Sequence, residues 1–193
     1  FACVSGTQGF FIGDFQGNIL SRDYIGHAQR ISIANYLPER KGFEIAVTNF
    51  WGHQGVIYLY DSDGNELWEK ENEMNGNILV NWLGNGTDFF LTNADAEKGG
   101  LMDGHGDIAV VFPDDGHPVM CCEAIDLLGD SRDELVVWDY HSLYIYTQEN
   151  EIEDSSYHPV KYPVYNASNY RGEYSFPDMS YITFNENPKE TKE

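Results

Sequence analysis

The sequence lacks both of the patterns by which helices are recognised. No apolar run approaches the roughly 18 residues that a membrane-spanning helix requires. No stretch of ten residues spaces its apolar side chains as an amphipathic helix does. Aromatic residues, in contrast, make up 15% of the chain and occur in short alternating stretches between turns. These features exclude a membrane-spanning helix and predict a chain made of β-strands.

Basic residues are also scarce. The chain has 11 Lys and Arg residues against 32 Asp and Glu residues, which gives a formal net charge of −21. A surface of this charge repels phosphate groups, so nucleic acid and anionic membranes are excluded as partners. Metal cations are its natural counterions. The acidic excess indicates a solvated surface or bound calcium, and these two interpretations are compatible.

Cysteine is rare, with three residues in the chain: Cys3, Cys121 and Cys122. None belongs to a Cys-x-x-Cys pair, and two adjacent cysteines are poorly placed to bridge each other. The cysteines therefore say little about the compartment of the protein. The chain begins at Phe1 without a Met and without the basic and apolar segments of a signal peptide. We expect a processed chain or a part of a longer one.

The sequence does contain an internal repeat. Residues 9–20 and 55–68 each have the pattern of a strand followed by Asp-x-x-Gly-Asn-x-Leu, and Asp61 lies 47 positions after Asp14. The Asp side chain can cap a turn and the Gly can adopt a positive φ, so each pattern predicts a β-hairpin. An offset of this size is typical of one blade of a β-propeller.

A second set of strands repeats at a similar distance. Apolar strands that follow an acidic residue occur at Glu44, Asp88 and Glu134, which are 44 and then 46 positions apart. The repeat predicts an all-β fold of β-propeller blades, with a blade in each of the segments 1–26, 27–76, 77–118 and 119–158. The blades and a closing segment occupy 1–184, and 185–193 is predicted to be a disordered tail. Three to four blades make a partial propeller, so we expect another fragment or a second copy to complete the ring.

An acidic segment around Gly129 is a candidate metal site. Asp126, Asp130, Asp133 and Glu134 lie on this glycine-bent segment, immediately before and at the start of a strand. Calcium takes six to eight oxygen ligands, and carboxylates on a tight loop can converge on one ion. The alternative is a solvated acidic turn in which an Asp caps its own backbone. The segment 103–107, Asp-Gly-His-Gly-Asp, is likewise a turn or a metal-binding loop.

Several side chains at strand ends could bind or act on a ligand. His27 and His53 could serve as bases near neutral pH, and Trp51, in a loop, could stack on a sugar ring. Near the end of the sequence, Tyr170 and Arg171 could contact a ligand, with Arg171 binding a carboxylate. For each residue the alternative is a structural or surface role.

Three segments in this order, 33–47, 80–93 and 124–138, resemble the later blades of rhamnogalacturonan lyases of polysaccharide lyase family eleven. The resemblance covers roughly residues 25–178. The chain departs from the family pattern at Asn35, where the family has Asp, and at Ser131, where it has Trp. It is also about a third as long as the family's propeller.

The resemblance implies a secreted, extracellular or periplasmic protein that performs calcium-assisted β-elimination on an acidic, rhamnose- and uronate-containing polysaccharide. In that chemistry a cation or Arg neutralises the uronate carboxylate, and a base removes the adjacent proton. Substrate would then contact His27, His53 or Arg171, with Trp51 and Tyr170 binding sugar rings. The alternative is a non-catalytic, calcium-stabilised propeller module that binds carbohydrate or protein.

Overall fold

The described residues of the protein form β-strands arranged in four antiparallel sheets. A computed structural model describes residues 1–51, 55–71, 76–130 and 132–150, and within these residues it contains 14 strands and no helix. The all-β prediction is therefore confirmed for this part of the chain. The predicted tail, 185–193, lies outside the described residues.

Each sheet is a meander in which strands that follow one another in the chain pair side by side. Sheet 1 contains β1 (Ala2–Val4), β2 (Phe10–Gly13) and β3 (Ile19–Asp23). Sheet 2 contains β4 (Ala28–Ala34), β5 (Glu44–Asn49), β6 (Val56–Tyr60) and β7 (Glu66–Glu71). Sheet 3 contains β8 (Ile78–Val80), β9 (Phe89–Asn93), β10 (Gly100–Met102) and β11 (Ile108–Val110). Sheet 4 contains β12 (Cys121–Ile125), β13 (Glu134–Trp138) and β14 (Leu143–Tyr146).

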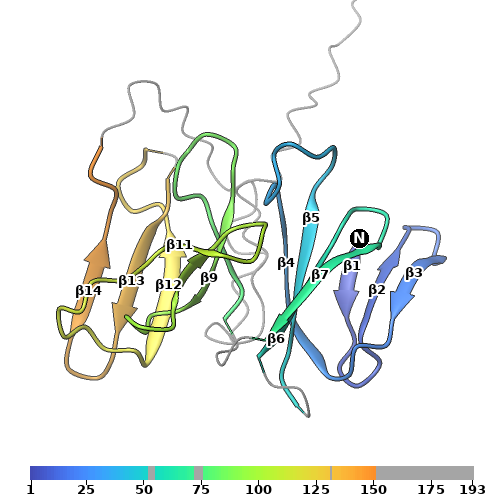
Figure 1. Cartoon of the computed structure of the whole chain (residues 1–193), viewed down its shortest axis with the longest axis horizontal. Helices are drawn as coiled ribbons and strands as arrows, with labels where there is room; N and C mark the ends of the chain where they lie inside the picture. Colours follow the sequence, from blue (N-terminus) through green and yellow to red (C-terminus); the bar gives the residue numbers. More distant parts are fainter. Residues whose placement is uncertain (52–54, 72–75, 131, 151–193) are drawn as a thin grey trace, which may run out of the picture.

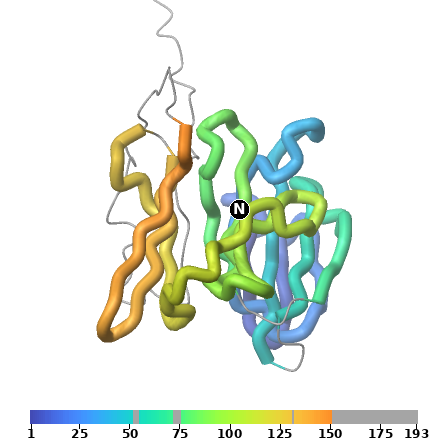
Figure 2. Tube along the Cα trace, turned by 60° about the vertical axis from the view of Figure 1, so that its left-hand side comes forward, coloured from blue at the N-terminus to red at the C-terminus, as the bar shows by residue number. Residues whose placement is uncertain are grey.

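The four sheets lie in chain order across the molecule. Each sheet falls within one of the four segments that the repeat predicted. Figure 1 shows sheet 1 and sheet 4 at opposite ends, with sheets 2 and 3 between them. Figure 2, which turns the molecule, shows sheet 4, in yellow and orange, beside sheet 3, in green. The described sheets do not form a closed ring.

The predicted hairpin turns form as the Asp and Gly residues require. In the β2–β3 turn, the Asp14 carboxylate accepts hydrogen bonds from the backbone N–H of Asn18 at 2.8 Å and of Gln16 at 3.0 Å. Asp61 makes the same contacts in the β6–β7 turn. Gly17 adopts a φ of 90°, which is favourable only for glycine.

Both faces of the inner sheets are apolar, and each face packs on a neighbouring sheet. Sheets 1 and 2 share one buried cluster, which includes Phe10 stacked on Tyr60 at a ring-centroid distance of 4.6 Å. Sheets 2 and 3 share a second cluster, in which Tyr36 contacts the edge of Phe90. Sheets 3 and 4 share a third. The core is thus divided into three layers, each of them between two sheets.

A reciprocal pair of hydrogen bonds joins successive sheets. The Asp88 N–H donates to the backbone oxygen of Asn35 at 3.0 Å, and the Asp88 carboxylate accepts the N–H of Asn35 at 2.9 Å. Asp133 makes the same two bonds to Asn81, at 3.0 and 2.7 Å. Asp88 therefore corresponds to Asp133, whereas Glu44 corresponds to Glu134. The predicted repeat grouped Asp88 with Glu44 and Glu134. In the structure, the position of sheet 3 that corresponds to these two glutamates is one residue after Asp88.

We expect Asp88→Ala to lower the free energy of unfolding by about 2 kcal/mol, because the inward-facing N–H of Asn35 loses its acceptor. Denaturant unfolding followed by circular dichroism measures the change. The matched control is Asp63→Ala, which removes an exposed carboxylate and should change stability by less than about 0.5 kcal/mol. Equal effects of the two substitutions would contradict the role of this bond pair.

Candidate functional site

Three rings gather where β4 begins and β5 ends. Because these strands pair antiparallel with Ala28 opposite Asn49, the residues on either side of that pair are neighbours. The N–H of Phe50 donates to the backbone oxygen of His27 at 3.0 Å. The Trp51 ring lies 6.2 Å from the His27 ring and 5.9 Å from the Phe50 ring, measured between centroids. We call His27, Phe50 and Trp51 the Trp51 group.

The Trp51 group combines a fixed backbone with an open aromatic surface. Gly6, in the β1–β2 turn, forms a β-bridge with Ala28 and lies against the His27 ring, so sheet 1 supports this corner of sheet 2. The Trp51 residue is nevertheless 67% exposed. An exposed indole whose neighbours limit its movement provides a flat apolar surface with a histidine at its side. This arrangement can stack on a planar apolar face of a ligand and donate or accept a hydrogen bond beside it.

The structure brings together one pair of the predicted binding and catalytic residues, His27 and Trp51. His53, Tyr170 and Arg171 lie outside the described residues. Trp82, in contrast to Trp51, packs on the buried cluster between sheets 3 and 4. The described part of the predicted ligand site is therefore a single corner of sheet 2.

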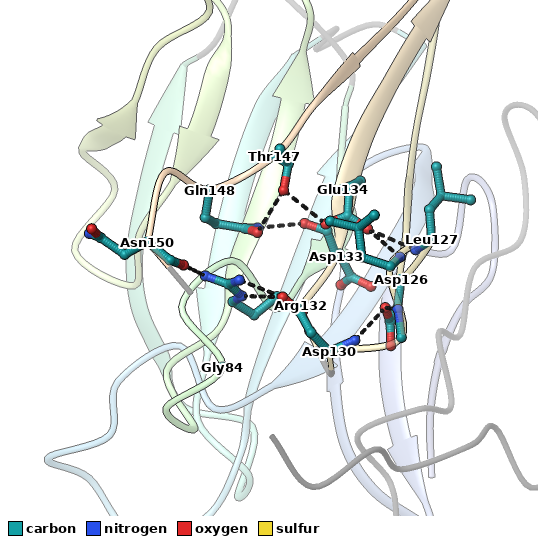
Figure 3. Close-up of polar contacts among 12 residues, drawn as sticks. Gly84, Asp126, Leu127, Asp130, Arg132, Asp133, Glu134, Thr147, Gln148 and Asn150 are labelled. Carbon is teal, nitrogen blue, oxygen red and sulfur yellow. Dashed lines mark hydrogen bonds and ion pairs between the residues drawn. The ribbon is translucent and has the colours of Figure 1, made fainter. Parts of the chain in front are cut away.

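The acidic segment before β13 lies at the opposite edge of the sheets, in the connection from β12 to β13. Its centre is Arg132, whose side chain is buried and whose guanidinium bonds the Asp130 carboxylate. The same guanidinium donates to the backbone oxygen of Asn150 at 2.5 Å, as Figure 3 shows. The hydrogen bonds to Arg132 hold the pKa of Asp130 below its ordinary value. Arg132, which the sequence reasoning did not single out, thus attaches this segment to the chain beyond β14.

The other three carboxylates of the segment are used in three separate places. Asp126 accepts the N–H of Gly129 at 2.6 Å, within its own turn. Asp133 is bonded to Asn81 of sheet 3. Glu134 accepts the N–H groups of Leu127 at 2.8 Å and Leu128 at 3.1 Å. The contact of Glu134 with Leu127, drawn in Figure 3, and those of Asp126 and Asp133 hold the backbone of the segment in place.

Glu134 repeats a contact that sheet 2 makes with Glu44. The Glu44 carboxylate accepts the N–H of Leu37 at 2.9 Å in the corresponding β4–β5 connection, and its burial raises its pKa. Both glutamates therefore have a structural explanation. In the part of the chain that the structure describes, no three His, Cys, Asp or Glu side chains are grouped so as to hold a metal ion. Calcium binding by Asp126, Asp130, Asp133 and Glu134 stays a prediction.

The segment 103–107 is a third copy of the hairpin turn. The Asp103 carboxylate accepts the N–H of His105 at 2.9 Å and of Asp107 at 3.1 Å, as Asp14 and Asp61 do in their turns. The His105 side chain is exposed, 3.8 Å from Glu39. The structural interpretation of this segment as a turn accounts for its residues. The repeat was hidden because Asp107 stands where the other two copies have Asn.

A histidine that the sequence analysis did not consider, His117, has both ring nitrogens against acceptors. Nε2 lies 2.6 Å from the backbone oxygen of Ala94, and Nδ1 lies 2.8 Å from the Asp115 carboxylate. A carbonyl and a carboxylate both require a donor, so the contacts are satisfied together only by the doubly protonated ring. Tyr146, from sheet 4, donates to the same carboxylate at 3.1 Å. A cavity of about 170 Å³ beside this group is lined mainly by apolar side chains of sheets 3 and 4.

The contacts of His117 make stability depend on pH. Burial lowers the pKa of His117, but the bonds to Ala94 and Asp115 raise it by more than burial lowers it. The pKa therefore lies above the ordinary 6.5. Its stabilising contribution is complete below pH 6.5 and is lost as pH rises through the raised pKa. We expect the melting temperature of His117→Gln to fall below that of the wild type at pH values under 6.5, and the difference to shrink at higher pH.

Thermal unfolding of both proteins across this pH range measures the effect, and an NMR titration of the His117 ring gives the pKa directly. His105→Gln is the control, because its ring lies at the surface. A wild-type advantage that is constant from acid to alkaline pH would contradict the assignment of a charged His117.

Comparison of the chain with protein-family models, curated proteins and solved structures gave no match. Among the residues that the structure describes, no helix has the length and apolar character needed to cross a membrane. The three cysteines, all within the described residues, are unpaired thiols.

Proposed function

We propose that the protein is a carbohydrate-binding module made of β-propeller blades, and that the Trp51 group is its ligand-binding corner. The observation that carries the proposal is the 67% exposure of Trp51, held beside the His27 ring. A buried aromatic needs no ligand to explain it, but a large exposed indole in contact with two other rings provides a surface on which a sugar ring can stack.

The arrangement of the sheets supports the propeller part of this proposal. Successive meanders stack face to face in chain order, as blades do, and two of them have the four strands of a complete blade. The same bond pair joins sheet 2 to sheet 3, through Asp88, and sheet 3 to sheet 4, through Asp133. When each sheet stacks on the one before it through the same contacts, the sheets form a curved array. Further blades would complete this array into a ring.

The charge of the chain bears on the choice of ligand. At a net charge of −21, an acidic polysaccharide is repelled unless a cation bridges it to the protein. A neutral sugar has no such cost. We propose that the acidic polysaccharide implied by the family resemblance binds only with calcium present, whereas neutral oligosaccharides bind without it. The secreted location implied by the same resemblance agrees with a polysaccharide ligand.

We expect Trp51→Ala to weaken binding of an oligosaccharide by about tenfold or more, because the stacking surface is lost. Calorimetry with neutral and uronate-containing oligosaccharides, each with and without calcium, measures the affinities. Phe15→Ala is the matched control, since Phe15 is 92% exposed in the β2–β3 turn, at the opposite edge of the sheets. Unchanged affinity of Trp51→Ala, with all ligands that bind, would refute the assignment of this corner.

A second candidate function is a polysaccharide lyase, and the position of His27 beside Trp51 favours it. A ligand stacked on Trp51 would bring its ring hydrogens close to the imidazole, where a base for β-elimination belongs. In that case His27→Asn should slow the reaction by about a hundredfold or more, a much larger loss than the loss of affinity that it causes. Incubation with rhamnogalacturonan and calcium, followed by the ultraviolet absorbance of unsaturated product, tests the activity. Binding without any product would retain the module and reject the lyase.

A further inference from the structure

The outer face of sheet 4, which points away from sheet 3, carries exposed apolar side chains around Glu123, which pairs with Val136. Its strands contribute Leu143, which is 61% exposed, and Ile145, which is 53% exposed. The pairing of β13 with β14 places Val136 opposite Ile145, on the same face. Three further exposed apolar residues, Ile125, Leu127 and Leu128, continue this patch into the β12–β13 connection. We call these six residues the sheet 4 end face.

The sheet 4 end face corresponds, position by position, to a face that is buried elsewhere in the chain. In sheet 2, Ala46 pairs with Leu59 as Val136 pairs with Ile145. Ile57 and Leu59, the counterparts of Leu143 and Ile145, are both 0% exposed because sheet 3 covers them.

The connecting loops show the same correspondence. Leu37 in the β4–β5 connection and Leu127 in the β12–β13 connection both donate their N–H to the glutamate, seven residues later, that opens the next strand. Leu37 is buried against sheet 3, whereas Leu127 is 48% exposed. The sheet 4 end face is therefore a blade-stacking surface without its neighbour among the described residues.

The other end of the molecule presents the complementary type of surface. In sheet 1, Cys3 pairs with Phe11 as Val47 pairs with Tyr58 in sheet 2. Val47 and Tyr58 lie on the face of sheet 2 that packs on sheet 1. Phe11 and the half-exposed Phe1, whose rings meet edge to face at 6.2 Å, lie on the corresponding face of sheet 1. We call Phe1, Cys3 and Phe11 the sheet 1 end face.

We propose that two copies of this chain associate head to tail, with the sheet 4 end face of one copy on the sheet 1 end face of the other. The inference rests on the proposed blade arrangement but not on carbohydrate binding. It commits to a second copy because the chain itself displays both halves of the stacking contact that its inner sheets use three times. A head-to-tail contact closes into a ring when its rotation allows, and two copies bring eight sheets, within the range of propellers.

The charge of the chain gives the association a distinctive salt dependence. Two copies that each carry a net charge of −21 repel one another at low ionic strength. The side chains that define the two end faces are uncharged, so the burial of these side chains is not weakened when salt screens this repulsion. Association should therefore strengthen as sodium chloride is raised, whereas an association built on ion pairs would weaken.

Sedimentation velocity of the full 193-residue chain, over a range of protein and salt concentrations, measures the association. We expect a dimer whose dissociation constant increases about tenfold or more in Ile145→Asp, which places a charge in the contact. Val119→Asp is the matched control, because Val119 is also 53% exposed but lies outside both end faces. A chain that stays monomeric at every concentration and salt level would overturn the proposal.

Mixing two defective variants distinguishes a head-to-tail contact from a symmetric one. Phe1→Asp damages the sheet 1 end face and Ile145→Asp damages the sheet 4 end face, so each variant alone should be monomeric. Their mixture retains one intact contact and should form a heterodimer. If Phe1→Asp dimerises normally, or if the mixture stays monomeric while both variants are folded by circular dichroism, the head-to-tail arrangement is wrong.

Hydrogen exchange on the wild-type chain provides a measurement that needs no variant. We expect protection of β1 and β14 to rise with protein concentration. Protection of β14 that is independent of concentration would show that another part of the same chain covers the end face, and would reject the second copy. Because none of these measurements uses a sugar, a failure of the dimer is distinguishable from a failure of carbohydrate binding.

Discussion

The fold depends on the burial of sheets that are apolar on both faces. A sheet of this kind needs a neighbour on each side, because either face left in water costs the free energy of exposing its aliphatic and aromatic side chains. In sheet 2, Ile45 and Val47 face sheet 1, while Ala46 and Leu59 face sheet 3. Because successive side chains of a strand point to opposite faces, the strands of one sheet contribute side chains to two layers of the core. The same requirement explains why the two terminal sheets each present an apolar face.

Polar contacts set how the sheets are placed on one another. Hydrophobic burial alone would allow neighbouring sheets to slide, whereas a buried carboxylate that accepts a particular N–H fixes the register. Asp88 and Asp133 perform this function between sheets, and Glu44 and Glu134 hold the connecting loops. Much of the acidic character that suggested a metal site is used in this way. The carboxylates of the hairpin turns, such as Asp14, bond backbone N–H groups in the same manner.

The connections between the strands lie at two opposite edges of the sheets, and these edges carry different groups of residues. One edge carries the turns and connections that hold the sheets together, including the acidic segment around Arg132. The opposite edge carries the Trp51 group. A proposed ligand site at the second edge can change in sequence without disturbing the carboxylate contacts at the first. In the proposed function, the blades act as a frame and binding would depend on a few residues in loops.

The strands, their order and their hairpin turns could be predicted from the sequence, because alternation and the Asp and Gly of a turn act over a few neighbouring residues. Asp14 and Asp61 form the predicted turns, and each of the four predicted segments contains one described sheet. The contacts between residues of different sheets became known from the three-dimensional fold. The one-position displacement of Asp88, the pairing of His117 with Ala94 and the burial of Arg132 depend on how layers stack. Contacts between residues far apart in the chain are set by packing in three dimensions, which the spacing of residues in a single sequence does not encode.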